Sequence, residues 1–306
     1  MRVAVTGSHG LIGTELVAEL GRRGHEVTRL VRSQPGPGEA AWDPAGGTIE
    51  TEKLEGHDAV VHLAGVGIGD HRWTDDHKRA VLDSRIQGTG LLARTLTGLS
   101  SPPKVLASGS AVGFYGYLSD EPMTEASPPG DGFLAGLVTA WEAAAAPAAD
   151  AGVRVVNVRS GVVLTAKGGA LKKELLPFKL GIAGKLGTGR QWLSWISLAD
   201  EVAAIIHLLT AGDLHGPVNV TSPEPVTNAE FTATLARVLR RPAFMPVPTL
   251  ALHALFGKGM TQEMLLGGQK VLPTVLEAAG FRFAYPRLED ALRYTLGAVT
   301  TPPPNR

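Results

Sequence analysis

The 306-residue sequence contains no cysteine, and its charges cancel. Without cysteine the chain has no disulfide, no thiolate-ligated zinc site, no iron–sulfur cluster and no thiol nucleophile. The 29 basic and 29 acidic residues give a formal net charge of zero. This balance argues against a basic nucleic-acid footprint and against a polybasic membrane patch.

Long apolar runs and several catalytic motifs are also missing. No apolar run reaches the roughly 18 residues of a membrane span, and the chain enters a strand-like segment directly after Met1. We therefore expect a cytoplasmic protein without a signal peptide, bound neither to a membrane nor to nucleic acid. The His-Glu-x-x-His, Gly-x-Ser-x-Gly and Walker motifs are absent. His71 and His77 lack a nearby third ligand, so no metal site is predicted.

Segments of strand and helix character alternate through about residue 160. This alternation is typical of an α/β protein with a Rossmann-type, doubly wound parallel sheet. Pro147 is expected to kink or end the third helix. The predicted strands are 2–6, 26–31, 59–63, 104–108 and 153–158, and the predicted helices are 11–23, 75–99 and 133–149.

The pattern changes beyond residue 160, where seven glycines fall between positions 161 and 189. A helix is predicted at 198–210, and a capping box at Thr227 predicts a helix to Leu239. Prolines bound a candidate strand at 243–247. We expect a smaller, mixed α/β C-terminal substrate domain. The predicted boundaries are 1–165 for the dinucleotide-binding domain, with part of 190–220 returning to its sheet, 166–300 for the lid domain and 301–306 for a disordered tail.

The first strand runs into a glycine loop with Gly7, Gly10 and Gly13 at the Gly-x-x-Gly-x-x-Gly spacing. The first glycine permits a tight turn, the second a close approach to a pyrophosphate, and the third close packing of helix on strand. The helix that follows begins with Leu11 and Ile12, and its free N–H groups favour an anion. This context predicts dinucleotide binding. The alternative is a glycine-rich turn in another kind of α/β protein.

The end of the second strand indicates which dinucleotide is bound. NAD sites usually place an acid there for the ribose 2′-hydroxyl, whereas an arginine suits a 2′-phosphate. The chain has Val31 and Arg32 at this point and no acid, which favours NADP(H). Alternatively, Arg32 is a solvated charge or stacks on adenine without selecting a phosphate.

A second cofactor segment is predicted at Leu63, Ala64 and Gly65, where small residues at the end of an apolar strand let a cofactor lie on the backbone. We interpret the preceding His62 as a half-buried strand histidine in preference to a catalytic one.

Further short motifs continue along the chain. They include Ser84-Arg85, the segment Ser-Ala-Val-Gly-Phe-Tyr-Gly at 110–116, Trp141-Glu142, Arg-Ser-Gly-Val-Val-Leu at 159–164, Gly-Thr-Gly-Arg-Gln-Trp at 187–192 and Gly280-Phe281. With these motifs the chain resembles the extended short-chain dehydrogenase/reductase superfamily. More closely, it resembles an atypical NAD(P)-dependent epimerase-like family with a distinctive C-terminal domain. The resemblance adds Ser108 and Val163 to the expected cofactor-binding residues.

The acid/base pair that the superfamily normally uses is missing. A Tyr-x-x-x-Lys motif lets the lysine lower the pKa of the phenol, which then exchanges a proton with the substrate. None of the four tyrosines has a lysine four positions later. If Glu142 aligns with the acid that commonly follows the lysine, Leu134 and Val138 occupy the Tyr and Lys positions. The usual dehydrogenase mechanism therefore cannot be carried over.

Three residues are candidates for an altered catalytic set. Ser110 stands where the family serine is expected, or else it only closes a strand end. Tyr115 could replace the missing phenol, or it is wall packing. Arg85 could supply the missing cation and contact the cofactor or an anion; the alternative is an ion pair on the helix face, for example with Asp83.

The glycines of segment 181–192 indicate a loop that closes over a ligand, and the family resemblance places this loop on the substrate side. Lys185 and Arg190 could hold an anionic or polyhydroxyl group, and Trp192 could stack on a flat or sugar face. The alternative is a structural turn with tryptophan in the core.

Two functions remain open from the sequence. The first is an NADP(H)-dependent oxidoreductase or epimerase-like enzyme acting on a small polar substrate, with an altered acid/base set. The second is an NADPH-binding sensor or interaction protein with little or no hydride transfer. By analogy with the family, we expect a homodimer.

Overall fold

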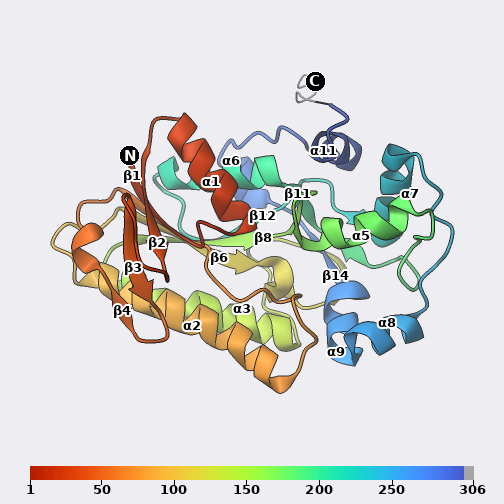
Figure 1. Cartoon of the computed structure of the whole chain (residues 1–306), viewed down its shortest axis with the longest axis horizontal. Helices are drawn as coiled ribbons and strands as arrows, with labels where there is room; N and C mark the ends of the chain where they lie inside the picture. The colour runs from red at the N-terminus through yellow and green to blue at the C-terminus, as the bar shows by residue number, and fades with distance from the viewer. Residues whose placement is uncertain (300–306) are drawn as a thin grey trace. The chain divides into compact units, whose positions relative to one another are not determined.

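The computed structural model describes residues 1–299, except for the side chains of residues 118 and 119, and the predicted tail 301–306 lies outside the described residues. An eight-stranded sheet has the strand order β12-β8-β6-β5-β1-β2-β3-β4 (Figure 1). Its strands are β1 (Arg2–Thr6), β2 (Glu26–Val31), β3 (Glu39–Asp43), β4 (Thr48–Ile49), β5 (Ala59–His62), β6 (Val105–Ala111), β8 (Arg154–Ser160) and β12 (Gly216–Val220).

The strand directions confirm the predicted doubly wound sheet. β1 pairs in parallel with β2 on one side and with β5 on the other. β2 continues in parallel to β3, and β5 to β6, while the short β4 runs antiparallel to β3. The strand order therefore reverses between β1 and β5. In open α/β sheets, ligands bind beyond the carboxyl ends of the strands at such a switch point.

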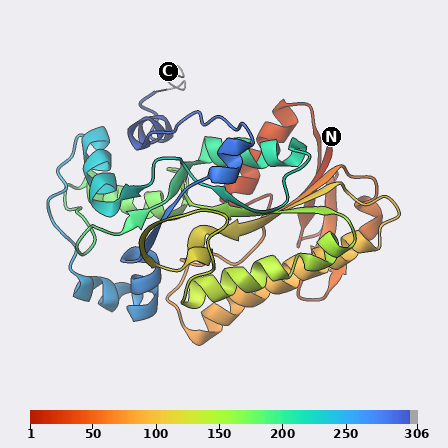
Figure 2. The ribbon, with the colours of Figure 1, turned by 180° about the vertical axis from the view of Figure 1, so that it is seen from behind.

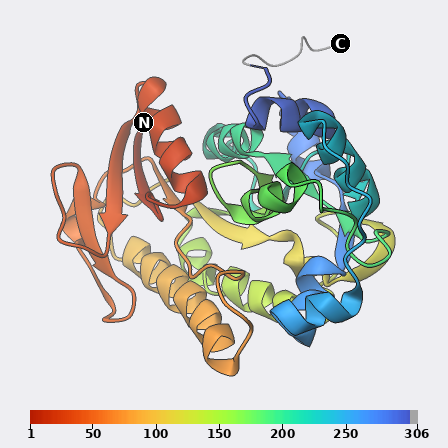
Figure 3. The same ribbon diagram turned by 45° about the vertical axis from the view of Figure 1, so that its right-hand side comes forward.

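Helices cover both faces of this sheet. Figure 3 shows α1 and α2 on opposite sides of the first strands, and Figure 2 shows α3 running beside α2. The central strands β1, β5 and β6 are mostly apolar and, apart from Arg2 and Ala111, buried, as expected for a parallel sheet covered on both faces. The predicted third helix is interrupted, because Pro147 stands in the first turn of α4 and lacks the N–H that a continuous helix needs. The helices are α1 (Leu11–Arg22), α2 (Asp75–Thr97), α3 (Phe133–Ala143), α4 (Ala146–Asp150) and α6 (Leu198–Thr210).

The chain divides into two compact units. The first unit comprises residues 1–110, 137–158 and 202–218, and the second comprises 111–136, 159–201 and 219–306. The domain boundaries expected from the sequence, 1–165 and 166–300, stay a prediction.

The second unit is built from short strand pairs and helices around its own core. The pairs are β7 (Leu118–Met123) with β14 (Gly268–Val271), β9 (Val162–Leu164) with β11 (Trp195–Ser197), and β10 (Trp192–Leu193) with β13 (Val226–Thr227). Its helices are α5 (Gly169–Lys179), α7 (Asn228–Leu239), α8 (Thr249–Phe256), α9 (Lys258–Met260), α10 (Thr274–Ala278) and α11 (Leu288–Thr295), with a π-helical turn at Thr261–Leu265. Apolar residues of α5, α7 and α11 share one core cluster.

The capping box predicted at Thr227 is formed, with the Thr227 side chain accepting from the Glu230 N–H and the Glu230 carboxylate accepting from the Thr227 N–H. The strand expected at 243–247 is not formed. Only Val247 makes an isolated parallel bridge, with Leu186. Prolines at 242, 246 and 248 remove the N–H donors that a ladder would need.

Across residues 1–299, no helix combines the length and the apolar character needed to cross a bilayer.

Candidate active site

The glycine loop after β1 brings three backbone segments closer together than side chains would allow. Gly7 has a φ of +65°, and a Cβ there would lie 2.7 Å from the carbonyl carbon of Leu63. A Cβ on Gly13 would overlap the Gly7 carbonyl oxygen. Among the described residues no side chain caps the start of α1, and its first turn holds no acid. The N–H groups of Leu11, Ile12 and Gly13 are therefore available to an anion.

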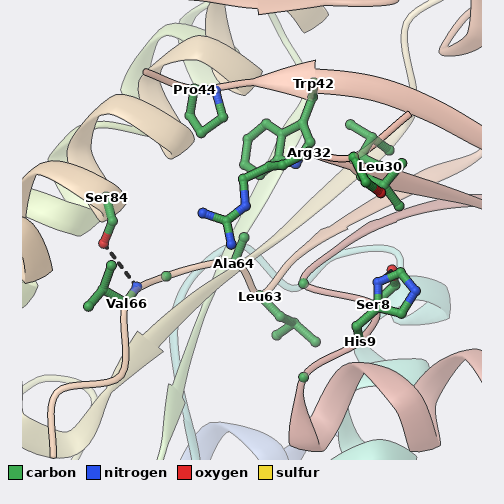
Figure 4. Close-up of a pocket in the computed structure, with 15 residues that line it drawn as sticks. Ser8, His9, Leu30, Arg32, Trp42, Pro44, Leu63, Ala64, Val66 and Ser84 are labelled. Carbon is green, nitrogen blue, oxygen red and sulfur yellow. Dashed lines mark hydrogen bonds between the residues drawn. The ribbon is translucent and has the colours of Figure 1, made fainter. Parts of the chain in front are cut away.

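A cavity of about 540 Å³ lies beside this loop. Its lining joins residues from the glycine loop, the end of β2, β3 and the segment after β5 (Figure 4). The lining residues are Gly7, Ser8, His9, Gly10, Leu30, Val31, Arg32, Ser33, Trp42, Pro44, Leu63, Ala64, Gly65, Val66 and Ser84. Its concave form, glycine cradle and open helix N-terminus fit a dinucleotide.

Arg32 is the cation of this cavity. Its side chain is exposed, and its guanidinium lies beside Trp42 and points toward Ala64 (Figure 4). No Asp or Glu stands among the residues that line the cavity. The cavity therefore offers a cation, and no carboxylate, to a negative group on the ligand.

The structure brings together seven of the predicted cofactor residues in this lining: Gly7, Gly10, Val31, Arg32, Leu63, Ala64 and Gly65. Trp42 and Pro44 are new, because β3 was not predicted from the sequence. Ser84 is also new; its hydroxyl accepts from the Val66 N–H at 3.1 Å and fixes the segment after β5. Its neighbour Arg85 was predicted as a site residue from the Ser84-Arg85 motif, whereas Ser84 was not.

Thr6 and His62 join the ends of β1 and β5. The Thr6 hydroxyl accepts from the N–H groups of Leu63 at 3.1 Å and Ala64 at 3.3 Å. With both lone pairs used, its one proton goes to His62 Nδ1 at 2.7 Å. His62 is fully buried, and burial, helped by the charge of Arg85, lowers its pKa to about 4. His62 is thus a strand histidine as expected, but it is fully buried and not half-buried. It is neutral and holds the predicted cofactor segment through Thr6.

The Arg85 side chain packs against the backbone of Gly65 and Val66, in the segment that follows β5. Its Nη1 donates to the carbonyl oxygens of Val66 at 2.9 Å and Val81 at 3.1 Å, and its guanidinium lies 4.8 Å from the centre of the Trp141 ring. A Cβ on Gly65 would stand 3.3 Å from the guanidinium carbon. Burial lowers the pKa of Arg85 to about 10. Arg85 does not line the cavity, and its contact with a cofactor or anion stays a prediction.

Ser110 lies at the end of β6, and its hydroxyl donates to Glu142 Oε1 at 2.6 Å. Glu142 belongs to α3, and its contact with the candidate serine was not predicted from the sequence. Ser108 lies two residues earlier on the same strand; it is fully buried, and its Oγ has no hydrogen-bond partner within the described part of the chain. Val138, at the position of the missing lysine, is 2% exposed.

Tyr115 belongs to the second unit, as does Val163 in β9. The Tyr115 hydroxyl donates to Asn219 Oδ1 at 2.7 Å and accepts from Arg159 Nη1 at 2.9 Å. Burial raises the pKa of the phenol. The side chain is 4% exposed, so the network holds it as part of a wall. Its catalytic role stays a prediction that this geometry does not favour.

The three predicted substrate residues also lie in the second unit. Lys185 and Arg190 are exposed. The Trp192 indole donates to Asp120 Oδ1 at 3.1 Å, and Lys270 Nζ lies 4.8 Å from the centre of its ring. Trp192 is half-buried and not a core residue. The role of these residues in substrate binding stays a prediction.

Comparison with known proteins decides the family. Residues 3–221 match the model of the NAD dependent epimerase/dehydratase family, and residues 247–295 match a domain of unknown function, DUF1731. The chain belongs to the NAD dependent epimerase/dehydratase family. The predicted resemblance to an epimerase-like family with a distinctive C-terminal domain is therefore confirmed.

Individual family members match over nearly the whole chain. An epimerase family protein of Mycobacterium bovis is 42% identical, covering 98% of each chain. The crystal structure of human epimerase family protein SDR39U1 with NADPH has a TM-score of 0.90 and 41% identity, covering 98% of this chain and 100% of that one. A nucleoside-diphosphate sugar epimerase of Corynebacterium glutamicum has a TM-score of 0.79 and 37% identity, covering 97% of this chain and 58% of that one.

Two glycines of α1 give a matched pair for testing the cradle. Gly13→Ala places a methyl group on the Gly7 carbonyl, so we expect loss of dinucleotide binding and a lower free energy of unfolding. In Gly21→Ala nothing lies within 4 Å of the new Cβ, so the same change in the same helix should stabilise by up to about 1 kcal/mol. Chemical unfolding and cofactor titration measure both. Equal effects of the two substitutions would contradict the assigned close approach.

Neutral His62 predicts a pH dependence of stability. The unfolded chain takes up a proton at His62 near its ordinary pKa of 6.5, whereas the folded chain does so only near 4. Between these values the unfolded state binds more protons, so the free energy of unfolding should fall as the pH falls. His62→Asn keeps an acceptor for Thr6 and should flatten this slope. Burial also lowers the pKa of His57, so part of the pH dependence should remain in this variant. Unfolding curves at several pH values with an unchanged slope in the variant would refute the assignment.

Proposed function

We propose that this chain binds NADPH and works as an NADP(H)-dependent oxidoreductase or epimerase-like enzyme on a small polar substrate, without the usual Tyr/Lys pair. The observation that carries the proposal is the cavity beside the glycine loop, in which Arg32 faces the ligand space and no acid lines the wall. The human relative, SDR39U1, has been crystallised with NADPH. The Corynebacterium relative is named a nucleoside-diphosphate sugar epimerase, which supports a polar substrate.

The cofactor groups can be assigned to parts of the cavity. The glycine loop and the open N–H groups of α1 would hold the pyrophosphate. Arg32, with the neighbouring Ser33, would hold the 2′-phosphate, since a guanidinium binds phosphate oxygens in pairs. Leu63, Ala64 and Gly65, held by the Thr6 hydroxyl, would form the backbone floor. Bound NADPH would supply the hydride in this chemistry.

For the substrate we propose a role for Ser110. Because its proton is directed to Glu142 Oε1, its oxygen remains an acceptor for a substrate hydroxyl. When NADP+ accepts the hydride, the proton of that hydroxyl would pass through Ser110 to the carboxylate. When NADPH donates the hydride, a proton would return by the same route to the oxygen of the reduced carbonyl. The chain would thus have a Ser/Glu pair in place of Tyr/Lys. Arg85 adds a buried cation below Gly65. Lys185, Arg190 and Trp192 remain the proposed substrate contacts.

The apolar Val138, at the position where the superfamily has its catalytic lysine, favours a second function. Val138 is buried, and the Tyr115 phenol is engaged with Asn219 and Arg159. These features fit an NADPH-binding sensor without hydride transfer. A panel of carbonyl compounds and nucleotide sugars, followed by nicotinamide absorbance, separates the two. Substrate-dependent oxidation of NADPH supports the enzyme, and tight binding without turnover supports the sensor.

Replacing Arg32 tests the choice of cofactor. Arg32→Gln removes the charged partner of the 2′-phosphate, and such a hydrogen-bonded charge contributes about 1.5–3 kcal/mol. We therefore expect the Kd for NADPH to rise about tenfold to a hundredfold, while the Kd for NADH stays unchanged. Arg29→Gln changes an arginine of β2, the strand that ends just before Arg32; Arg29 does not line the cavity, so this change should leave both constants unaltered. If wild type bound NADH as tightly as NADPH, the assignment of Arg32 would be wrong.

A further inference from the structure

Among the exposed large apolar side chains of the second unit, five lie near the end of α5 and in the loop after α7. They come from the end of α5 and from two loops, and we call them the apolar patch. The apolar patch comprises Leu176 (65% exposed), Leu180 (63%), Ile182 (55%), Phe244 (74%) and Met245 (49%). Exposed apolar side chains that form one contiguous patch are typical of an interaction site, whereas scattered ones are not.

Backbone hydrogen bonds hold the two loops side by side. The Met245 N–H donates to the Ala183 carbonyl at 3.2 Å, and the Val247 N–H donates to the Lys185 carbonyl at 2.9 Å. The Pro242 ring lies 3.3 Å from where a Cβ would stand on Gly181. Figures 1 and 2 show α5 next to α7 with both following loops at the same end of the unit. The apolar patch is therefore one surface.

The segments that carry the apolar patch are strongly basic. Residues 166–199 and 231–262 contain a single acid, Glu174, among their lysines and arginines. Four exposed cations flank the patch: Lys172, Lys179, Arg240 and Arg241. Within residues 1–299, none of these side chains forms an ion pair with a carboxylate. The net charge of zero hides this asymmetry, because acids elsewhere in the chain compensate for it.

Glu174 offers only part of a full negative charge to these cations. Burial raises the pKa of its carboxyl group to about 7, so a substantial fraction is neutral at physiological pH.

We propose that the apolar patch and its four flanking cations bind the surface of a membrane rich in anionic lipids. Side chains that protrude between lysines and arginines can enter the headgroup region while the cations meet lipid phosphates. A second copy of this chain is disfavoured as the occupant, because two such patches would bring like charges together. The contact is peripheral and uses no membrane-spanning helix.

Vesicle co-sedimentation of the full chain tests this proposal. The probes are phosphatidylcholine vesicles with and without phosphatidylglycerol. We expect binding only to the anionic vesicles, and weaker binding as salt is added. Lys179→Gln with Arg241→Gln should lower the partition coefficient more than tenfold, at about fivefold for each charge. Leu180→Ser with Phe244→Ser should also lower it, because the apolar side chains no longer insert.

Matched variants separate the patch from general charge effects. Lys53→Gln with Arg79→Gln removes two exposed cations of the first unit and should leave partitioning unchanged. NADPH titration of each variant shows that it is folded. No sedimentation with anionic vesicles, or equal losses in the two charge variants, would overturn the proposal. Light scattering that shows a dimer broken by Phe244→Ser would assign the patch to a second copy instead and would also overturn it.

Discussion

The close approach of backbone at Gly7 and Gly13 is the constraint on which the rest of the site depends. Because neither residue has a Cβ, α1 can begin against the turn that follows β1, and that turn can lie against the backbone after β5. Thr6 and His62 then tie β1 to β5 at the same level. The result is an open helix N-terminus facing a cavity at the point where the strand order reverses.

Local patterns in the sequence predicted the sheet and the phosphate cradle because both depend on residues close together in the chain. Each apolar strand is a short continuous run, and the glycine spacing and Arg32 lie within the first thirty-two residues. Trp42 and Pro44 were missed since β3 is short and lies among glycine and proline residues, which read as loop. Their place beside Arg32 follows only from the pairing of β2 with β3.

Other features depend on contacts between distant residues, which no local pattern shows. Ser110 meets Glu142 across 32 positions, and Tyr115 meets Asn219 across 104. These contacts alter the interpretation of the candidate catalytic residues: the serine gains a carboxylate partner, whereas the tyrosine is committed to a buried network. The distribution of charge is likewise not visible in the composition. A net charge of zero does not show that lysines and arginines lie close together on α5 and the loops beside it.

The central claim is that this family member selects a dinucleotide by its 2′-phosphate. Calorimetric titration of the wild-type chain with adenosine 2′,5′-bisphosphate and with adenosine 5′-monophosphate isolates that group, because neither ligand reaches the nicotinamide side. The account predicts that the bisphosphate binds at least about tenfold more tightly. Equal affinities for the two ligands would contradict it.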